Sequence, residues 1–135
     1  MDRLSPERRS WLMSQVKAKN TKPEIAVRKL IYASGFRYRL HVDNLPGKPD
    51  IVFHGRKKII FVHGCFWHGH TGCKYARLPK QRVEFWSQKI GRNRERDSKT
   101  IGELEKKGWR VLVVWQCELK KPELLAEEIK NFLQP

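Results

Sequence analysis

Asp50 and His63 are the first residues of this sequence whose types and spacing suggest chemistry. Asp50 follows Pro49 at the start of a short apolar segment, and the next apolar segment ends in His63. If the two segments form a β-hairpin, both side chains lie at one edge of the sheet. A carboxylate beside backbone carbonyls suits Mg²⁺, which prefers oxygen ligands, activates water and stabilises charge on a phosphodiester. The alternative is that Asp50 only caps the adjoining turn.

His68 follows His63 after the short segment Gly64-Cys65-Phe66-Trp67. An imidazole can accept a proton from water at neutral pH or, when protonated, bind a phosphate. A lone histidine is more often structural. Two histidines so close together, beside an acidic strand end and a basic surface, favour a hydrolytic site.

Three cysteines and one histidine have the types and spacing of a metal site. Cys65, His70 and Cys73 follow a C-x₄-H-x₂-C pattern, and Cys117 comes after a later apolar segment. Three thiolates and one imidazole form a closed tetrahedral Zn²⁺ site, which would hold an otherwise irregular loop against the sheet. The alternative is three buried or free thiols. Three cysteines cannot all pair within the chain, so a secreted disulfide framework is not expected.

Two aromatic pairs lie in or beside basic segments. Phe66 and Trp67 stand together in the loop, and Phe85 and Trp86 lie among lysines and arginines. Apolar side chains wedged between base steps unstack and kink a DNA duplex, which is one expectation for these residues. The alternative is that all four belong to the core.

Asp97 falls on one helical face with Ile101 and Leu104, at positions i, i+4 and i+7. A carboxylate on this inward face needs a partner. A histidine ring N–H would serve, and the contact would fix the tautomer of the ring. The alternative is an exposed ion pair with Arg94 or Arg96.

The spacing of apolar residues predicts alternating helices and strands. Helices are expected over residues 5–16, 21–34, 82–107 and 122–133, and strands over residues 36–40, 50–53, 58–63 and 110–115. Thr21 and Glu24 form a capping box at the second helix, which by itself explains Glu24. At Gly91 the third helix either continues or breaks. The strand over residues 58–63 is apolar enough to be central and buried on both faces, and the strand over residues 110–115 is expected to be buried as well. The predicted fold class is α/β, a mixed sheet with helices on both sides.

The charge balance is strongly basic, with 29 Lys and Arg against 14 Asp and Glu and a net charge of +15. Residues 1–50 carry 11 basic and 5 acidic side chains, residues 51–110 carry 15 and 5, and residues 111–135 carry 3 and 4. Such a surface releases counterions when it binds a polyanion, so DNA is the expected partner. A basic surface kept for solubility is the alternative. No segment is long and apolar enough for a signal peptide or a membrane span, and a cytoplasmic protein is expected.

Several motifs together resemble the very short patch repair (Vsr) DNA mismatch endonucleases. The resemblance runs from about Thr21 to Cys117, and the block H-G-C-F-W-H at residues 63–68 is highly specific. The other motifs are Leu45-Pro46-Gly47-Lys48-Pro49-Asp50, Glu84-Phe85-Trp86, Lys89-Ile90-Gly91, Asn93, Glu95-Arg96-Asp97 and Gly108-Trp109-Arg110-Val111-Leu112.

The resemblance implies a restriction-endonuclease-like fold and Mg²⁺-dependent nicking of duplex DNA. The implied substrate is a T·G mismatch, which arises when 5-methylcytosine deaminates, and the implied cut lies 5′ of the mispaired thymine. A catalytic domain is expected over residues 21–135. Residues 1–20 are basic and weakly apolar, and we expect an arm or helix that becomes ordered on DNA. A monomer is expected, with a mismatch-repair protein as a further partner.

The resemblance also assigns roles by motif position. Asp50 corresponds to the metal-binding aspartate and the Val62 carbonyl to a second ligand point. His63 corresponds to the phosphate-side histidine, His68 to the histidine that activates water and Asp97 to the carboxylate that supports it. The remaining correspondences are Glu24 to an acidic residue near the site, Phe66, Trp67 and Trp86 to the aromatic wedge, and Cys65, His70, Cys73 and Cys117 to structural zinc ligands.

Three departures from the usual patterns affect the site. The family often has threonine where Val62 stands, which matters little if only the backbone carbonyl binds the metal. The loop between Cys65 and Cys73 contains glycines where relatives are often richer in histidine, so the register of His70 is an expectation. The second strand of the hairpin carries no Glu-x-Lys, the common restriction-enzyme pattern, and His63 stands where that lysine would be.

Two other hypotheses remain open at this point. One is a restriction-like or transposon-type nuclease of the same fold without mismatch preference, which would cut homoduplex DNA equally well. The other is a zinc-stapled DNA-binding module without catalysis, in which replacing His68 changes nothing.

Overall fold

The computed structural model describes residues 21–40, 42 and 44–134. The expected helix over residues 5–16 and the basic arm over residues 1–20 lie outside the described residues. The described chain forms one four-stranded sheet in the order β1 (Arg39–Leu40), β2 (Ile51–Phe53), β3 (Lys58–His63) and β4 (Arg110–Trp115). Strand β2 is antiparallel to both β1 and β3, whereas β3 and β4 are parallel.

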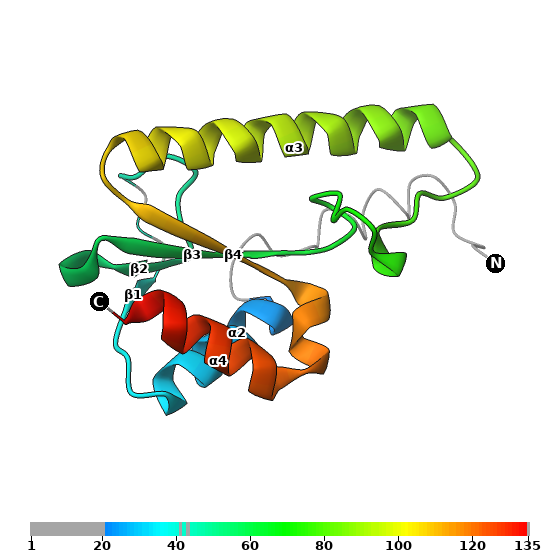
Figure 1. Ribbon diagram of the computed structural model, residues 1–135. Helices are drawn as coiled ribbons and strands as arrows, with labels where there is room; N and C mark the ends of the chain where they lie inside the picture. Colours follow the sequence, from blue (N-terminus) through cyan, green and yellow to red (C-terminus); the bar gives the residue numbers. More distant parts are fainter. Residues whose placement is uncertain (1–20, 41, 43, 135) are drawn as a thin grey trace.

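Helices cover both faces of the sheet (Figure 1). Helix α3 (Val83–Lys106) lies along one face, and α2 (Lys22–Ala33) and α4 (Pro122–Leu133) lie together against the other. Short 3₁₀ turns occupy His54–Arg56, Lys74–Ala76 and Gln116–Lys120. The predicted α/β class, a mixed sheet between helices, is confirmed. None of the helices in the described part of the chain is long and apolar enough to span a bilayer.

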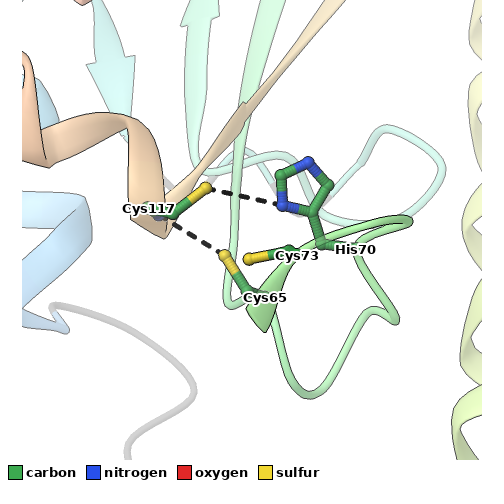
Figure 2. Close-up of side chains that lie close together, drawn as sticks. All are labelled: Cys65, His70, Cys73 and Cys117. Carbon is green, nitrogen blue, oxygen red and sulfur yellow. Dashed lines mark hydrogen bonds between the residues drawn. The ribbon is translucent and has the colours of Figure 1, made fainter. Parts of the chain in front are cut away.

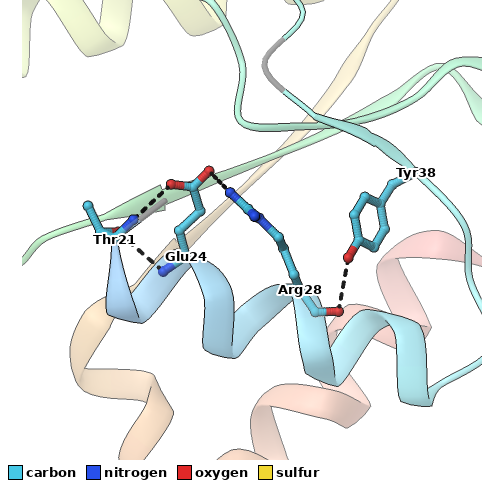
Figure 3. Close-up of polar contacts among 4 residues, drawn as sticks. All are labelled: Thr21, Glu24, Arg28 and Tyr38. Carbon is cyan, nitrogen blue, oxygen red and sulfur yellow. Dashed lines mark hydrogen bonds and ion pairs between the residues drawn. The ribbon is translucent and has the colours of Figure 1, made fainter. Parts of the chain in front are cut away.

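Helix α2 begins at the predicted capping box (Figure 3). The Thr21 side-chain oxygen accepts from the Glu24 N–H at 3.3 Å, and the Thr21 N–H donates to the Glu24 carboxylate at 3.4 Å. Two orphan N–H groups of the first turn are thereby satisfied. The other carboxylate oxygen of Glu24 accepts from Arg28 at 2.7 Å, and the Arg28 carbonyl accepts from the Tyr38 hydroxyl at 3.4 Å.

The strand expected over residues 36–40 is shorter than predicted, because its first residues complete the end of α2. Gly35 has a φ of +92°, and the Phe36 N–H donates to the Ile31 carbonyl at 3.3 Å. This contact closes the last turn of the helix in the manner of a glycine C-cap. The Phe36 N–H is therefore committed to α2, and strand pairing starts only at Arg39.

The pleat of β3 separates two cores. Ile60 points toward α2 and α4, where it packs with residues such as Ile31 and Ile129, whereas Ile59 and Phe61 point toward α3 and pack with Leu104. Strand β3 is buried on both faces, as predicted. Strand β4, which was expected to be buried, is buried only in part: Val114 is fully buried, the four other apolar residues are half-buried and Arg110 is exposed. Strand β4 lies at the edge of the described sheet, so it has a neighbouring strand on one side only.

Helix α3 continues without a break from Val83 to Lys106, through Gly91. A glycine inside a helix costs about 1 kcal/mol relative to alanine, which a neighbouring buried contact can offset. Ile90, directly before Gly91, is buried, and Leu104 fixes the other end of the helix in the core. Asp97 lies between these two anchors, so both ends of the helix restrain its position.

Candidate active site

A cavity of about 640 Å³ opens between the end of β3 and helix α3. It brings together five of the predicted residues: Val62, which offers only its backbone, and the side chains of Asp50, His63, His68 and Asp97. These come from four segments, namely the start of β2, the end of β3, the following loop and α3. The cavity adjoins the core on the α3 side of the sheet, where the side chains change from apolar to polar.

The sheet register explains why Asp50 and His63 face the same cavity. Ile51 pairs with Ile60 and Val52 with Ile59 in the antiparallel β2–β3 ladder. Because side chains alternate along a strand, Asp50 lies on the α3 side with Val52, and His63 lies there with Phe61. The Phe61 and His63 rings are 5.8 Å apart. The hairpin predicted from the sequence therefore places both polar side chains on one face.

His68 and Asp97 form the shortest polar contact of the site. The Nδ1 of His68 lies 2.6 Å from Oδ2 of Asp97, and both side chains are about a quarter exposed or less. An ionised carboxylate only accepts hydrogen bonds, so it holds the hydrogen on Nδ1 and leaves Nε2 as the acceptor. This is the arrangement of a general base with a carboxylate that fixes its tautomer. Asp97 therefore pairs with a histidine, as expected, rather than with Arg94 or Arg96.

The rings of His63 and His68 stack almost in parallel, with centroids 3.8 Å apart and planes 7° apart. Burial of the His63 ring, followed by the proximity of His68, lowers the pKa of His63 to about 4, although Asp97 acts in the opposite direction. Two adjacent imidazolium rings would repel each other in this buried position. At neutral pH, His63 is consequently an uncharged ring that can still offer an N–H to an anion.

The loop after β3 is an ordered turn held against α3. The His68 N–H donates to the Gly64 carbonyl at 3.1 Å, and the His70 N–H donates to the Cys65 carbonyl at 2.9 Å. From α3, the side-chain amide of Asn93 donates to the Trp67 carbonyl at 2.8 Å. The ordered turn expected between the two histidines is thus present, and Asn93 holds it within reach of Asp97.

Gly69 makes the closest approach between this loop and α3. Its φ is +62°, and a Cβ at this position would lie 2.6 Å from Cγ2 of Ile90 and 2.8 Å from Cδ of Arg94. Gly69→Ala is therefore expected to push the loop away from the helix and stretch the contact between His68 and Asp97. We expect a loss of about 2–4 kcal/mol in unfolding free energy, from left-handed strain plus overpacking, measured by urea unfolding.

Gly72→Ala is the matched control, because Gly72 has a similar φ of +72° but open space around it. It should cost only the left-handed strain, about 1–2 kcal/mol. Equal losses for the two variants would show that the loop does not rest on α3 at Gly69.

The four predicted zinc ligands come together beside the active-site loop (Figure 2). The ligand atoms of Cys65, His70, Cys73 and Cys117 all lie within 4.8 Å of one another. The Cys117 N–H donates to the Cys65 sulfur at 3.4 Å, and Cys117 Sγ lies 3.5 Å from His70 Nδ1. His70 is therefore the histidine of the cluster, as expected. Three sulfurs and one imidazole nitrogen are a donor set that suits zinc.

The protonation of Cys117 also fits a cation site. Burial and the neighbouring Cys65 and Cys73 sulfurs raise the pKa of Cys117 to about 12. Several thiolates would repel one another at this spacing. A divalent cation would remove that repulsion and stabilise the deprotonated ligands.

Phe66, Trp67 and Trp86 form one aromatic cluster where the loop meets the first turns of α3. Their ring centroids lie 5.2–5.9 Å apart in edge-to-face contacts, and all three side chains are half-buried. Phe85 stacks on the edge of Trp86 and is 43% exposed. These residues are neither a closed core nor isolated surface groups. They form a partly exposed aromatic surface, and Trp67 directly precedes His68, which lines the cavity.

Of the two remaining predicted site residues, Val62 lies at the cavity and Glu24 does not. Val62 lines the cavity, and its side chain packs against the core on the α2 and α4 side, so its backbone is the part available to the cavity. Glu24 is 2% exposed, caps α2 and binds Arg28, and it is not among the residues that line the cavity.

Comparisons with known proteins identify relatives of this chain. The model of the family described as DNA mismatch endonuclease Vsr matches residues 1–74. The type II nicking enzyme V.XorIIP of Xanthomonas oryzae pv. oryzae is 56% identical over 134 residues, which cover 99% of this chain and 98% of that enzyme. The chain belongs to the Vsr family. The DNA mismatch endonuclease Vsr of Escherichia coli is 42% identical over 120 residues, covering 89% of this chain and 76% of that protein.

As a member of the Vsr family, the chain is a DNA endonuclease, and the hypothesis of a non-catalytic binding module is wrong. The catalytic domain of the homing endonuclease I-Bth0305I has a related fold, with a TM-score of 0.56 and 22% identity. The match covers 84% of this chain and 94% of that domain. It supports the expected nuclease fold.

Two basic residues that line the cavity were not among the site residues predicted from the sequence. Lys48 and Arg96 both line the cavity beside Asp50 and Asp97. Arg96 donates to the Asn93 side chain at 3.0 Å, which places it on the cavity side of α3. Lys48 adopts a φ of +47° in the turn before Asp50. The position of Arg96 directly before Asp97, in a basic segment, could have indicated that it lies at the site. For Lys48, only the geometry of the turn shows that it reaches the cavity.

Proposed function

We propose that this enzyme nicks one strand of duplex DNA on the 5′ side of the thymine in a T·G mismatch, with Mg²⁺ as its catalytic ion. The observation that carries the proposal is the contact between His68 and Asp97 in the cavity that also holds Asp50 and His63. A general base, its supporting carboxylate and a second carboxylate for a metal are the groups that phosphodiester hydrolysis requires. Membership of the Vsr family supports the reaction and the substrate class.

His68 is the proposed general base. Its Nε2 accepts a proton from the attacking water, while the Nδ1 hydrogen stays on the contact with Asp97. The Asp97 carboxylate stabilises the imidazolium that forms and keeps the ring oriented. His63 is the proposed phosphate-side histidine: it is neutral in the free enzyme and gains a proton more easily once an anionic phosphate enters.

The Asp50 carboxylate and the Val62 carbonyl are the proposed Mg²⁺ ligands. The donor set is oxygen-rich at this end of the cavity, which fits a hard cation. When bound, Mg²⁺ would lower the pKa of water and offset negative charge on the scissile phosphate. Lys48 and Arg96 are proposed to hold the neighbouring phosphate oxygens, since both cations line the same cavity.

Mismatch recognition is assigned to Phe66, Trp67 and Trp86. Their surface adjoins the cavity, and Lys89 lies 5.7 Å from the Trp67 ring centroid, next to where a phosphate would pass. Unstacking a mismatched pair costs less than unstacking a matched one, so an aromatic wedge favours the T·G site.

The remaining assignments follow from the family. Cys65, His70, Cys73 and Cys117 are proposed to hold a structural Zn²⁺, and residues 1–20 to form an arm ahead of the catalytic domain over residues 21–135. Glu24 is proposed to act near the site through the start of α2. We also propose that the enzyme acts as a monomer in the cytoplasm, on nucleoid DNA, and works with a mismatch-repair protein.

The proposal is tested with duplexes labelled separately on each strand and carrying either T·G or T·A at one position. With Mg²⁺, we expect a single cut 5′ of the mispaired thymine and no cut in the other strand. The rate on T·A should be about 5- to 150-fold lower, as follows from about 1–3 kcal/mol of discrimination per base pair. Equal rates on the two duplexes would favour a nuclease without mismatch preference.

A further inference from the structure

Trp115 stands between the candidate active site and the cysteine cluster. It is the last residue of β4 and pairs in register with His63, the last residue of β3. Its ring meets the His63 ring edge to face, with centroids 5.3 Å apart and planes 79° apart. On its other side it stacks in parallel on His70, with centroids 4.1 Å apart and planes 5° apart.

The two histidines of the loop each rest on a ring that comes from the sheet. His68 stacks on His63 at 3.8 Å, and His70 stacks on Trp115 at 4.1 Å. The two sheet rings also touch each other. Four rings therefore form a continuous series that begins at His68, beside Asp97, and ends at His70, inside the cysteine cluster.

The backbone of Trp115 is fixed independently of these ring contacts. Its N–H donates to the Glu118 carboxylate at 2.9 Å, and its strand pairs with β3. The indole is thus a rigid surface with two χ angles, against which His70 of the loop packs. Trp115 is not among the residues that line the cavity, and it is not one of the four residues of the cysteine cluster.

We propose that Trp115 is a positioning residue for the nicking reaction: through its contacts with His70 and His63, it holds His68 in register with Asp97. The inference rests on the proposed function for its kinetic part, whereas the geometry can be tested without any cleavage. If the indole is removed, the loop keeps its cluster ligands but loses the surface on which His70 rests. His63 then loses its edge contact, and the ring on which His68 stacks becomes free to tilt.

The chain contains a matched control in Trp109. This tryptophan precedes the same strand, β4, is 7% exposed, and meets His54 edge to face at 5.9 Å and 79°. It lies at the opposite end of β4, in the core with Leu104. Trp115→Leu and Trp109→Leu therefore remove the same kind of ring at the two ends of β4, and each breaks one edge-to-face contact with a histidine.

The experiment compares full-length Trp115→Leu, Trp109→Leu and Trp115→Phe. Single-turnover nicking of a T·G duplex should fall about 10- to 100-fold in Trp115→Leu, because a displacement of about 1 Å in a catalytic group costs about 10² in rate. Duplex affinity and zinc content should match those of Trp109→Leu, which should nick at close to the wild-type rate. Trp115→Phe keeps one six-membered ring and should recover most of the lost rate.

A second measurement reads the geometry directly by NMR. A nuclear Overhauser effect between the ring protons of His63 and His68 should be present in the wild type and in Trp109→Leu, and lost in Trp115→Leu. The upfield shift that the indole gives to the His70 ring protons should disappear as well. If Trp115→Leu does not fold, Trp115→Met, which is also without a ring, replaces it in both measurements.

Equal nicking rates in Trp115→Leu and Trp109→Leu would overturn the proposal. So would a loss of zinc in Trp115→Leu that accounts for the loss of rate, because the indole would then act on the cluster alone. If the wild type does not nick T·G duplexes, the proposed function fails. The ring-proton contacts still decide the positioning role: their survival in Trp115→Leu contradicts it, and their selective loss supports it.

Discussion

Asp50→Asn is expected to lower the single-turnover rate of nicking by at least about 10³-fold. Asparagine keeps the shape of the side chain but removes the charge that would hold Mg²⁺, and a catalytic metal contributes several kcal/mol to charge stabilisation, at about 1.4 kcal/mol per factor of ten. Affinity for the T·G duplex should stay equal or rise, since one negative charge is removed from the cavity that is proposed to hold the scissile phosphate. The measurements are single-turnover cleavage and duplex binding, both over a range of Mg²⁺ concentrations.

Glu103→Gln is the matched control for this change of carboxylate to amide. Glu103 is exposed on α3 and lies outside the cavity. Its variant should nick at close to the wild-type rate, with the same dependence on Mg²⁺. An Asp50→Asn enzyme that still cuts and needs no more Mg²⁺ than the wild type would remove Asp50 from the metal site.

His70→Gln is expected to weaken metal binding at the cysteine cluster and to lower the free energy of unfolding by several kcal/mol. The imidazole lies among three sulfurs, and a closed zinc site contributes its binding free energy to folding. We expect one zinc per chain in the wild type by elemental analysis. A competing chelator should remove zinc from His70→Gln at a concentration that leaves the wild type loaded.

His54→Gln serves as the control, because His54 is exposed and lies at the opposite end of the sheet, beside Trp109. It should hold zinc as tightly as the wild type and unfold at nearly the same urea concentration. If His70→Gln and His54→Gln lose zinc equally, the fourth ligand of the cluster is not His70.

The sequence was most informative where local chemistry decides the structure. The capping box at Thr21, the hairpin between Asp50 and His63, and the inward position of Asp97 are all consequences of short-range patterns, and each is confirmed. The four residues of the cysteine cluster were predicted from their types and spacing, and the structure brings the His70 ring together with the three cysteine sulfurs. No pattern in a sequence shows that two imidazole rings will stack.

The wrong or incomplete expectations depend on contacts that the residue pattern alone does not show. The apolar strand β4 was expected to be buried, but it lies at the edge of the described sheet and most of its residues are only half-buried. Phe36 has a good strand pattern, yet its N–H closes α2. Gly91 could have ended a helix, but buried residues along α3 keep the helix continuous. Lys48 reaches the cavity through a left-handed turn that its residue type does not favour.

The parallel pairing of β3 and β4 has a consequence for how the enzyme is made. His63 meets Trp115, its register partner, only after some fifty further residues, including the whole of α3, have been synthesised. Helix α3 can form early from local contacts, whereas closing this long loop is slow and comes late in folding. We therefore expect a nascent chain on the ribosome to carry a formed α3 before it carries an assembled site. The ability to cut should arrive last, when β4 joins the sheet.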